Sequence, residues 1–95
     1  MRIVLAPMEG LADVHLRRLL TAQGGFDWVV SEFVRVGSRG YPDRVFYNTC
    51  PELRNDGKTD CGTPIRVQLL GNDLGAMAEN AKRAVRLGSY GIDIN

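Results

Sequence analysis

Two side-chain amides lie near the ends of segments that the sequence predicts to be strands. Gln68 belongs to the apolar run 65–70, and Asn95 follows the run 91–94. Because side chains alternate across a strand, each amide shares a face opposite to its aliphatic neighbours. An inward pair of amides offers donors and acceptors that match the edge of a planar heterocycle. The alternative for each amide is a buried structural residue that pairs with neighbouring backbone groups.

Acidic and imidazole side chains give weaker predictions. The alternation that turns Asn95 inward also turns Asp93 inward. Glu32 stands within an otherwise apolar run and is either a buried acid or an ion-pair partner of Arg66. His15 falls on a predicted helix away from the strand ends, so we expect it at the surface.

The two cysteines, Cys50 and Cys61, lack the spacing of a metal site. Neither belongs to a CxxC motif, and no histidine is close to them in the sequence. We therefore expect two free thiols in a loop region and no bound metal. No signal-peptide-like apolar segment precedes the first charged residues, which favours the reducing cytoplasm.

These side chains must be positioned by four predicted strands, which correspond to apolar runs at residues 3–8, 28–34, 65–70 and 91–95. The first run has β-branched residues and no alternation, so it predicts a strand buried on both faces, as in a parallel sheet. The connection 37–64 is the least regular part of the chain, with one short helix expected around 44–48. Such a long connection is more often functional than idle.

Two helices are predicted between the strands. The first follows Asp13 as its N-cap and stops before Gly24 and Gly25; the second follows Asn72 or Asp73. The residues predicted to face inward are Val14, Leu16, Leu19 and Leu20 in the first helix, and Leu74, Met77, Ala78, Ala81, Ala84 and Val85 in the second. The basic residues predicted to lie on the solvated faces are Arg17, Arg18, Lys82, Arg83 and Arg86.

Alternation of strands and helices predicts an α/β fold with a parallel sheet. Four strands fit either half of an eight-stranded barrel or part of a doubly wound sheet. The first strand is followed by the sequence MEGLAD, which lacks the GxGxxG fingerprint of dinucleotide-binding folds. This absence favours the barrel.

Composition excludes several classes of protein. The chain has 95 residues, enough for one small domain, with 44% hydrophobic and 24% charged residues, as in ordinary globular proteins. The net charge of +1 lacks the basic excess of a dedicated nucleic-acid binder. Any contact with RNA or DNA is therefore expected to be local, and no membrane association is predicted.

Four sequence motifs together resemble a known family. The motifs are LAPMEG at 5–10, SEFVRV at 31–36, VQLLG at 67–71 and GIDIN at 91–95. Their order and spacing resemble those of the tRNA-dihydrouridine synthases, and CPEL at 50–53 is most similar to the bacterial C-type subgroup. The resemblance covers the whole chain.

The resemblance implies a fold and a reaction. Residues 1–95 would be the amino-terminal part of an FMN-binding (β/α)8 TIM barrel, with about four strands and therefore incomplete. The rest of the barrel and a helical tRNA-binding domain would lie outside these residues. Such an enzyme reduces a uridine of the tRNA D-loop to 5,6-dihydrouridine with NADPH, and the subgroup suggests position 16. The enzyme is expected to be a cytoplasmic monomer without a metal.

The resemblance also implies roles for individual residues. Three would lie against the flavin, Gln68 would hydrogen-bond to its pyrimidine edge, Asn95 would approach the substrate nucleotide, and Arg35 would help to hold tRNA. The three flavin-facing residues are Pro7, Met8 and Glu9. The protein would then orient a cofactor that carries the redox chemistry.

One family residue has no counterpart within these 95 residues. The family's proton-donating cysteine would stand three positions beyond Asn95, and neither Cys50 nor Cys61 matches it. We therefore expect no catalytic residue here and an inactive chain. The alternatives are another FMN-dependent TIM-barrel oxidoreductase and an inactive remnant that only binds RNA; the charge of +1 argues against the remnant.

Overall fold

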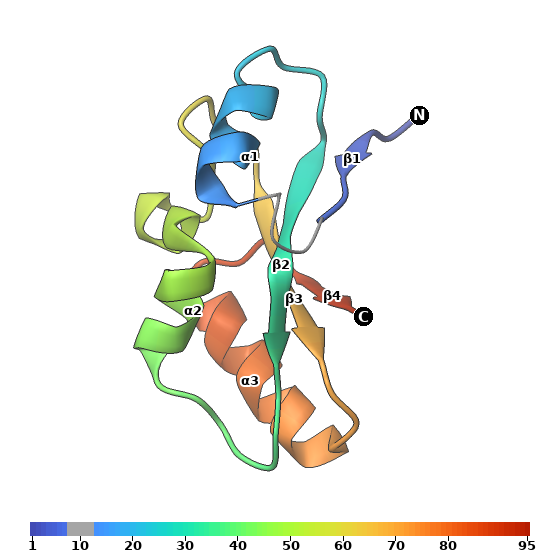
Figure 1. Cartoon of the computed structure of the whole chain (residues 1–95), viewed down its shortest axis with the longest axis vertical. Helices are drawn as coiled ribbons and strands as arrows, with labels where there is room; N and C mark the ends of the chain where they lie inside the picture. The colour runs from blue at the N-terminus through green and yellow to red at the C-terminus, as the bar shows by residue number, and fades with distance from the viewer. Residues whose placement is uncertain (8–12) are drawn as a thin grey trace.

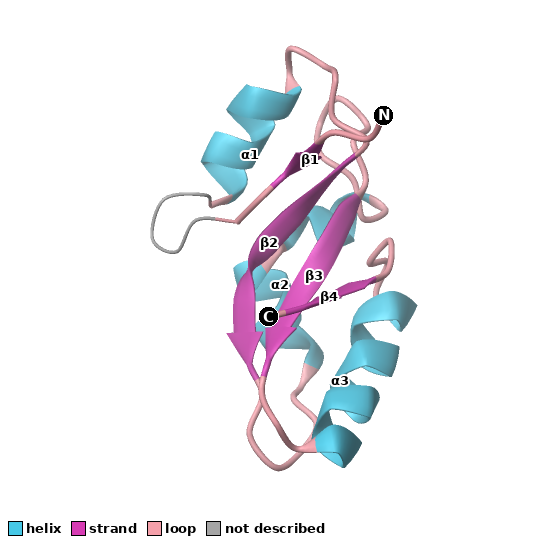
Figure 2. Cartoon of the chain, turned by 90° about the vertical axis from the view of Figure 1, so that its right-hand side faces the viewer, coloured by secondary structure: helices cyan, strands magenta, loops and turns pink. Residues whose placement is uncertain are grey.

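The computed structural model describes residues 1–7 and 13–95, which form one parallel sheet with helices on one side (Figures 1 and 2). The strands are β1 (Val4–Leu5), β2 (Trp28–Arg35), β3 (Ile65–Leu70) and β4 (Ile92–Ile94). The helices are α1 (Val14–Thr21), α2 (Asp43–Thr49) and α3 (Leu74–Arg86), with a 3-10 helix η1 (Pro51–Asn55) after α2. The predicted short helix at 44–48 is therefore confirmed as α2, whereas η1 was not predicted.

The order of strands in the sheet distinguishes between the two predicted topologies. The order is β1-β2-β3-β4, and all three neighbouring pairs are parallel. In a doubly wound sheet the strand order reverses at a switch point and helices cover both faces. Here the order is sequential and Figure 2 shows one sheet face without a helix over it, which is the arrangement in part of a barrel.

Both predicted helix starts are confirmed by side-chain caps. A carboxylate oxygen of Asp13 accepts a hydrogen bond from the Leu16 N–H at 3.0 Å. Asp73, and not Asn72, caps α3 by accepting from the Ala76 N–H at 3.0 Å. Each cap satisfies a backbone donor that has no partner within the helix.

The core lies between the sheet and the helices. Among its fully buried strand residues, Ile65, Val67 and Leu69 alternate along β3 as predicted. Residues of the helices and of the connection between them pack against this face: Phe46, Cys50, Leu53, Ala76, Met77 and Ala84. The opposite face of β3 carries Gln68, so the predicted separation of aliphatic and polar faces is confirmed.

The first strand differs from the prediction. β1 has two residues instead of a longer buried run, and Ile3 and Val4 are exposed. β1 lies at the edge of the sheet and pairs only with β2, and one face of the sheet has no helix over it (Figure 2). A run of this composition is buried on both faces only when a packed layer covers each face of the sheet.

The predicted inward faces of both helices are partly wrong. In α1, Leu19 and Leu20 are exposed, whereas Arg17 and Thr21 are fully buried. In α3, the buried residues are Ala76, Met77, Asn80 and Ala84, while Leu74, Ala78 and Val85 are exposed. In each helix, only part of the predicted apolar stripe packs against other described residues. The rest of the stripe faces solvent.

Arg17 is the clearest correction, because it was predicted to be solvated. It is completely buried and makes a bidentate ion pair with Glu52 of η1, with Nε to Oε2 at 2.6 Å and Nη2 to Oε1 at 2.9 Å. The other predicted surface basic residues are exposed or, for Arg83, half-buried in an ion pair with Asp43 at 3.0 Å. The Arg17–Glu52 pair therefore joins α1 to the connection after β2.

Candidate functional site

A polar cleft of about 200 Å³ lies at the carboxyl ends of the strands. Its lining residues come from all four strands or from the residues that follow them: Pro7, Glu32, Phe33, Gln68 and Asn95. Pro7, Gln68 and Asn95, which are far apart in the sequence, are thus brought together around one cavity. Met8 and Glu9 lie outside the described residues.

Side-chain hydrogen bonds connect Asn95 to Gln68 and Gln68 to Asp93 in this cleft. The Gln68 Nε2 donates to Asp93 Oδ2 at 2.8 Å, and the Asn95 Nδ2 donates to Gln68 Oε1 at 3.2 Å. The predicted inward placement of Asp93 and Asn95 is confirmed. Gln68 is almost completely buried, and its side-chain partners are other side chains and not neighbouring backbone groups.

An irregularity in β2 shapes the same cleft. The pairing with β3 shifts by one residue between Val30 and Phe33, so Ser31 and Glu32 form a bulge. The Ser31 hydroxyl donates to the Glu32 carbonyl at 2.8 Å and accepts the Gln68 N–H at 3.2 Å. The polar pair within the predicted apolar strand therefore supports the backbone of β3 at Gln68.

The expected ion pair between Glu32 and Arg66 is absent among the described residues. The Arg66 guanidinium lies instead 4.1 Å from the centre of the Trp28 ring and 5.4 Å from that of Tyr90. Glu32 lines the cleft and is half-buried. Of the two predictions for Glu32, the partly buried acid is therefore the one that holds.

Arg35 lies beside a second and larger cleft, of about 470 Å³. Its lining residues are the last residues of β2 and β3 and residues that follow these strands: Arg35, Val36, Gly37, Tyr41, Leu70, Gly71 and Asn72. The Arg35 guanidinium is 5.6 Å from the centre of the Phe33 ring, so Arg35 adjoins the first cleft through that ring. No carboxylate pairs with Arg35 in residues 1–7 and 13–95, which leaves its charge available to an anionic ligand.

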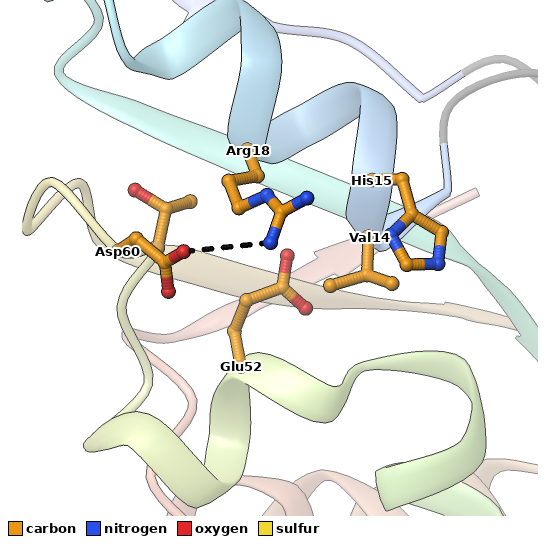
Figure 3. A pocket seen from close by; sticks show the side chains of 6 residues that line it. Val14, His15, Arg18, Glu52 and Asp60 are labelled. Carbon is orange, nitrogen blue, oxygen red and sulfur yellow. Dashed lines mark ion pairs between the residues drawn. The ribbon is translucent and has the colours of Figure 1, made fainter.

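A third cavity, of about 120 Å³, lies between α1 and the connection after α2 (Figure 3). Arg18 and Asp60 form an ion pair across it at 3.8 Å, but both side chains are largely exposed. Exposed pairs of this kind contribute at most about 1 kcal/mol. His15 is exposed, as predicted, and the Glu52 carboxylate is held by Arg17. This cavity contains no group prepared for catalysis.

Among residues 1–7 and 13–95, no three His, Cys, Asp or Glu residues lie close enough together to bind a metal ion. None of the helices in this part of the chain has the length and apolarity needed to cross a membrane.

Both cysteines are free thiols, as predicted, but their environments are opposite. Cys50 is buried at the end of α2, and desolvation strongly raises its pKa. Cys61 is exposed, and hydrogen bonds from the side chains of Thr59 and Thr63 help to lower its pKa to about 7. The Thr59 and Thr63 hydroxyl oxygens are 3.4 and 3.6 Å from its sulfur.

A disulfide reagent is therefore expected to modify Cys61 rapidly in the folded chain and Cys50 only after unfolding. Because the thiolate is the nucleophile, the rate at Cys61 should rise between about pH 6 and about pH 8, below the range of an ordinary cysteine. Ellman's reagent measures both the rate and the number of thiols. Cys61→Ser should abolish the fast phase and Thr59→Val should move it to higher pH; equal reaction of both thiols in the folded chain would contradict this assignment.

The fold and the cleft together define a class. Parallel strands in sequential order, with polar side chains gathered at their carboxyl ends, are the architecture of a β/α-barrel enzyme's catalytic face. Residues 4–95 match the dihydrouridine synthase (Dus) family, and the chain belongs to this family.

Individual relatives agree with this membership. The chain is 54%, 55% and 56% identical to the tRNA-dihydrouridine(16) synthases of Haemophilus influenzae, Pasteurella multocida and Haemophilus ducreyi. The matches cover 100%, 100% and 99% of this chain and 31%, 30% and 29% of those proteins. The chain thus spans about a third of the length of these relatives.

Sequence reasoning did not find every residue of the two clefts. Phe33 was assigned only to a strand, Tyr41 only to the irregular connection, and Asn72 only as one of two candidate helix caps. Tyr41 lines the larger cleft because its N–H donates to Asn80 of α3 at 2.9 Å, while its hydroxyl accepts the Gly37 N–H at 3.0 Å. No local pattern predicts the contact with Asn80, because Asn80 is 39 residues away in the sequence.

Proposed function

We propose that this chain is the amino-terminal part of a flavin-dependent enzyme that reduces a uridine in the D-loop of tRNA to 5,6-dihydrouridine with NADPH. Family membership and relatives named for tRNA dihydrouridine 16 support the reaction and the position. The observation that carries the proposal is the convergence of Pro7, Gln68 and Asn95 on one cleft at the carboxyl ends of the strands.

The donor set of this cleft fits the polar edge of FMN. After pairing with Asp93 and Asn95, Gln68 keeps one amide N–H and one carbonyl lone pair. An adjacent donor and acceptor match the C=O and N–H groups of a flavin's pyrimidine edge. Gln68 would bind this edge, and Pro7, Met8 and Glu9 would lie against the ring. When bound, FMN supplies the hydride that NADPH provides.

Two residues are proposed to bind tRNA. Asn95 stands at the mouth of the cleft, where its free carbonyl oxygen and second N–H can pair with the uracil edge. Arg35 offers an unpaired guanidinium beside the larger cleft, suited to a phosphate of the tRNA. The uridine must leave its stack to reach the cleft, which the partly open strand-end position permits.

Protonation of the uracil needs a general acid, and neither of the two cysteines lies in the cleft. Cys50 is sequestered in the core, and Cys61 contacts the carboxyl end of α1. We propose that the acid is a cysteine beyond Asn95, on the loop that follows β4. We further propose that the whole enzyme is a cytoplasmic monomer that uses neither a metal nor a membrane.

A chimaera tests the function directly. These 95 residues replace the matching segment of the Haemophilus influenzae relative, to which they are 54% identical. The chimaera should purify with FMN and form dihydrouridine in unmodified tRNA in the presence of NADPH, detected by nucleoside mass spectrometry. The unchanged relative is the positive control. A folded chimaera that forms no dihydrouridine would overturn the proposal, and FMN-dependent NADPH oxidation without any change in tRNA would favour another flavin oxidoreductase.

A further inference from the structure

We propose that Asp93 is a positioning residue that fixes which way the amides of Gln68 and Asn95 face. This inference rests on the proposed function, because it concerns how the cleft presents those amides to the flavin and the nucleotide. Nothing in the sequence motifs gives Asp93 this role.

The direction of the hydrogen bonds carries the argument. An ionised carboxylate can only accept, so the group that faces Asp93 Oδ2 at 2.8 Å must be the NH2 of Gln68. The Gln68 carbonyl then necessarily points away from Asp93, where it accepts from Asn95 Nδ2 at 3.2 Å. One acceptor-only group therefore orients two amides in succession.

The register between β3 and β4 places Asp93 beside Gln68. Gln68 and Asp93 are direct partners in the parallel pairing of β3 with β4. The backbone on both sides is tied, since the Gln68 N–H donates to the Ser31 hydroxyl and the Asn95 N–H donates to the Leu69 carbonyl at 2.9 Å. Among the described residues no cation forms an ion pair with Asp93, so its Oδ2 remains available to Gln68.

The orientation matters because a reversed amide would offer the wrong groups. Turning the Gln68 amide over would place its carbonyl oxygen against the Asp93 carboxylate, which is repulsive. With a neutral side chain at position 93, both orientations become accessible, and only one of them presents the donor and acceptor in the right order. A ligand's apparent affinity falls with the share of the competent orientation.

Asp93→Ala and Asp93→Asn separate orientation from simple packing. In the chimaera, Asp93→Ala should weaken FMN binding about tenfold, because the charge-assisted hydrogen bond is lost. Asp93→Asn keeps the size of the side chain and one hydrogen bond, but it no longer fixes which way the Gln68 amide faces. It should therefore weaken FMN binding by about two- to fivefold. Quenching of flavin fluorescence measures both constants. The matched control is Asp56→Asn, in an exposed turn with φ of 58°, which asparagine tolerates.

A spectroscopic readout does not depend on FMN. The 95-residue chain contains only two glutamines, Gln68 and the exposed Gln23. Glutamine labelled with ¹⁵N therefore gives two side-chain NH2 signals, and that of Gln68 should be shifted and slow to exchange. Asp93→Asn and Asp93→Ala should move the Gln68 signal toward that of Gln23, while Asp56→Asn should move neither.

The two readouts distinguish failure of this inference from failure of the proposed function. Tight FMN binding within twofold of the unchanged chimaera in Asp93→Ala would overturn the role of Asp93 while the function stands. A chimaera that binds no FMN, together with a Gln68 signal that depends on Asp93, would overturn the flavin function and keep the orienting contact. An unchanged Gln68 signal in both variants would also overturn the role of Asp93.

Discussion

Replacing Arg17 by alanine is expected to destabilise the fold by about 3 to 5 kcal/mol, because it leaves the buried Glu52 carboxylate without its partner. Arg17 also donates to the Thr49 carbonyl at 3.4 Å, so a second contact weakens at the same time. Burial acts to lower the pKa of Arg17, but the hydrogen bonds and charge of Glu52 outweigh it and raise that pKa. The guanidinium therefore stays charged, and the carboxylate depends on it.

Urea unfolding followed by circular dichroism measures this effect. Since small domains have only about 5 to 15 kcal/mol of stability, Arg17→Ala should lose a large fraction of it and unfold at a much lower urea concentration. The exposed neighbour Arg18 is the matched control, and Arg18→Ala should cost at most about 1 kcal/mol. The double variant Arg17→Met with Glu52→Leu should recover most of the loss, because it removes both buried charges.

The same measurements can contradict the assignment. If Arg17→Ala and Arg18→Ala were equally mild, the buried pair would not be what joins α1 to η1. If the double variant were no more stable than Arg17→Ala, the loss would come from packing of the Arg17 side chain and not from the uncompensated charge of Glu52.

Arg17 also shows where prediction from the sequence reaches its limit. Local patterns predicted the helix itself and its cap at Asp13, because capping depends on residues within one turn. Which face is buried depends on what packs against the helix, and Glu52 is 35 residues away in the sequence. Hydrophobicity alone therefore placed Leu19 inside and Arg17 outside, the reverse of what the structure shows.

The polar cleft was more predictable than the helix faces. Strand alternation alone placed Gln68, Asp93 and Asn95 on one face, because the period of two does not depend on neighbours. The hydrogen bond from Gln68 to Asp93 was not predictable, since it requires the register between β3 and β4. In the sequence, the bulge at Ser31 and Glu32 corresponds only to a polar pair in an apolar run. Such a pair is compatible with several local structures, so it did not predict the bulge.

The second large effect is expected in catalysis. The 95-residue chain alone, incubated with FMN, NADPH and unmodified tRNA, should form no dihydrouridine. Saturating the uracil double bond requires a hydride on one carbon and a proton on its neighbour, and the proton must come from a positioned general acid on the other side of the ring. A hydride donor without such an acid cannot complete the reaction, and we expect this acid to be the cysteine proposed beyond Asn95.

The positions of the two thiols explain why the chain cannot supply this proton from its own cysteines. Helix α1 runs antiparallel to the strands, so the Cys61 sulfur, 2.8 Å from the Thr21 carbonyl, lies toward the amino ends of the strands, whereas the cleft lies at their carboxyl ends. Cys50 is fully buried, and its raised pKa reflects desolvation in the core. Cys61→Ser should accordingly leave the activity of the chimaera unchanged. Dihydrouridine above the enzyme-free background from the short chain would show that another group within these residues protonates the uracil, and would move the catalytic acid into the cleft around Gln68 and Asn95.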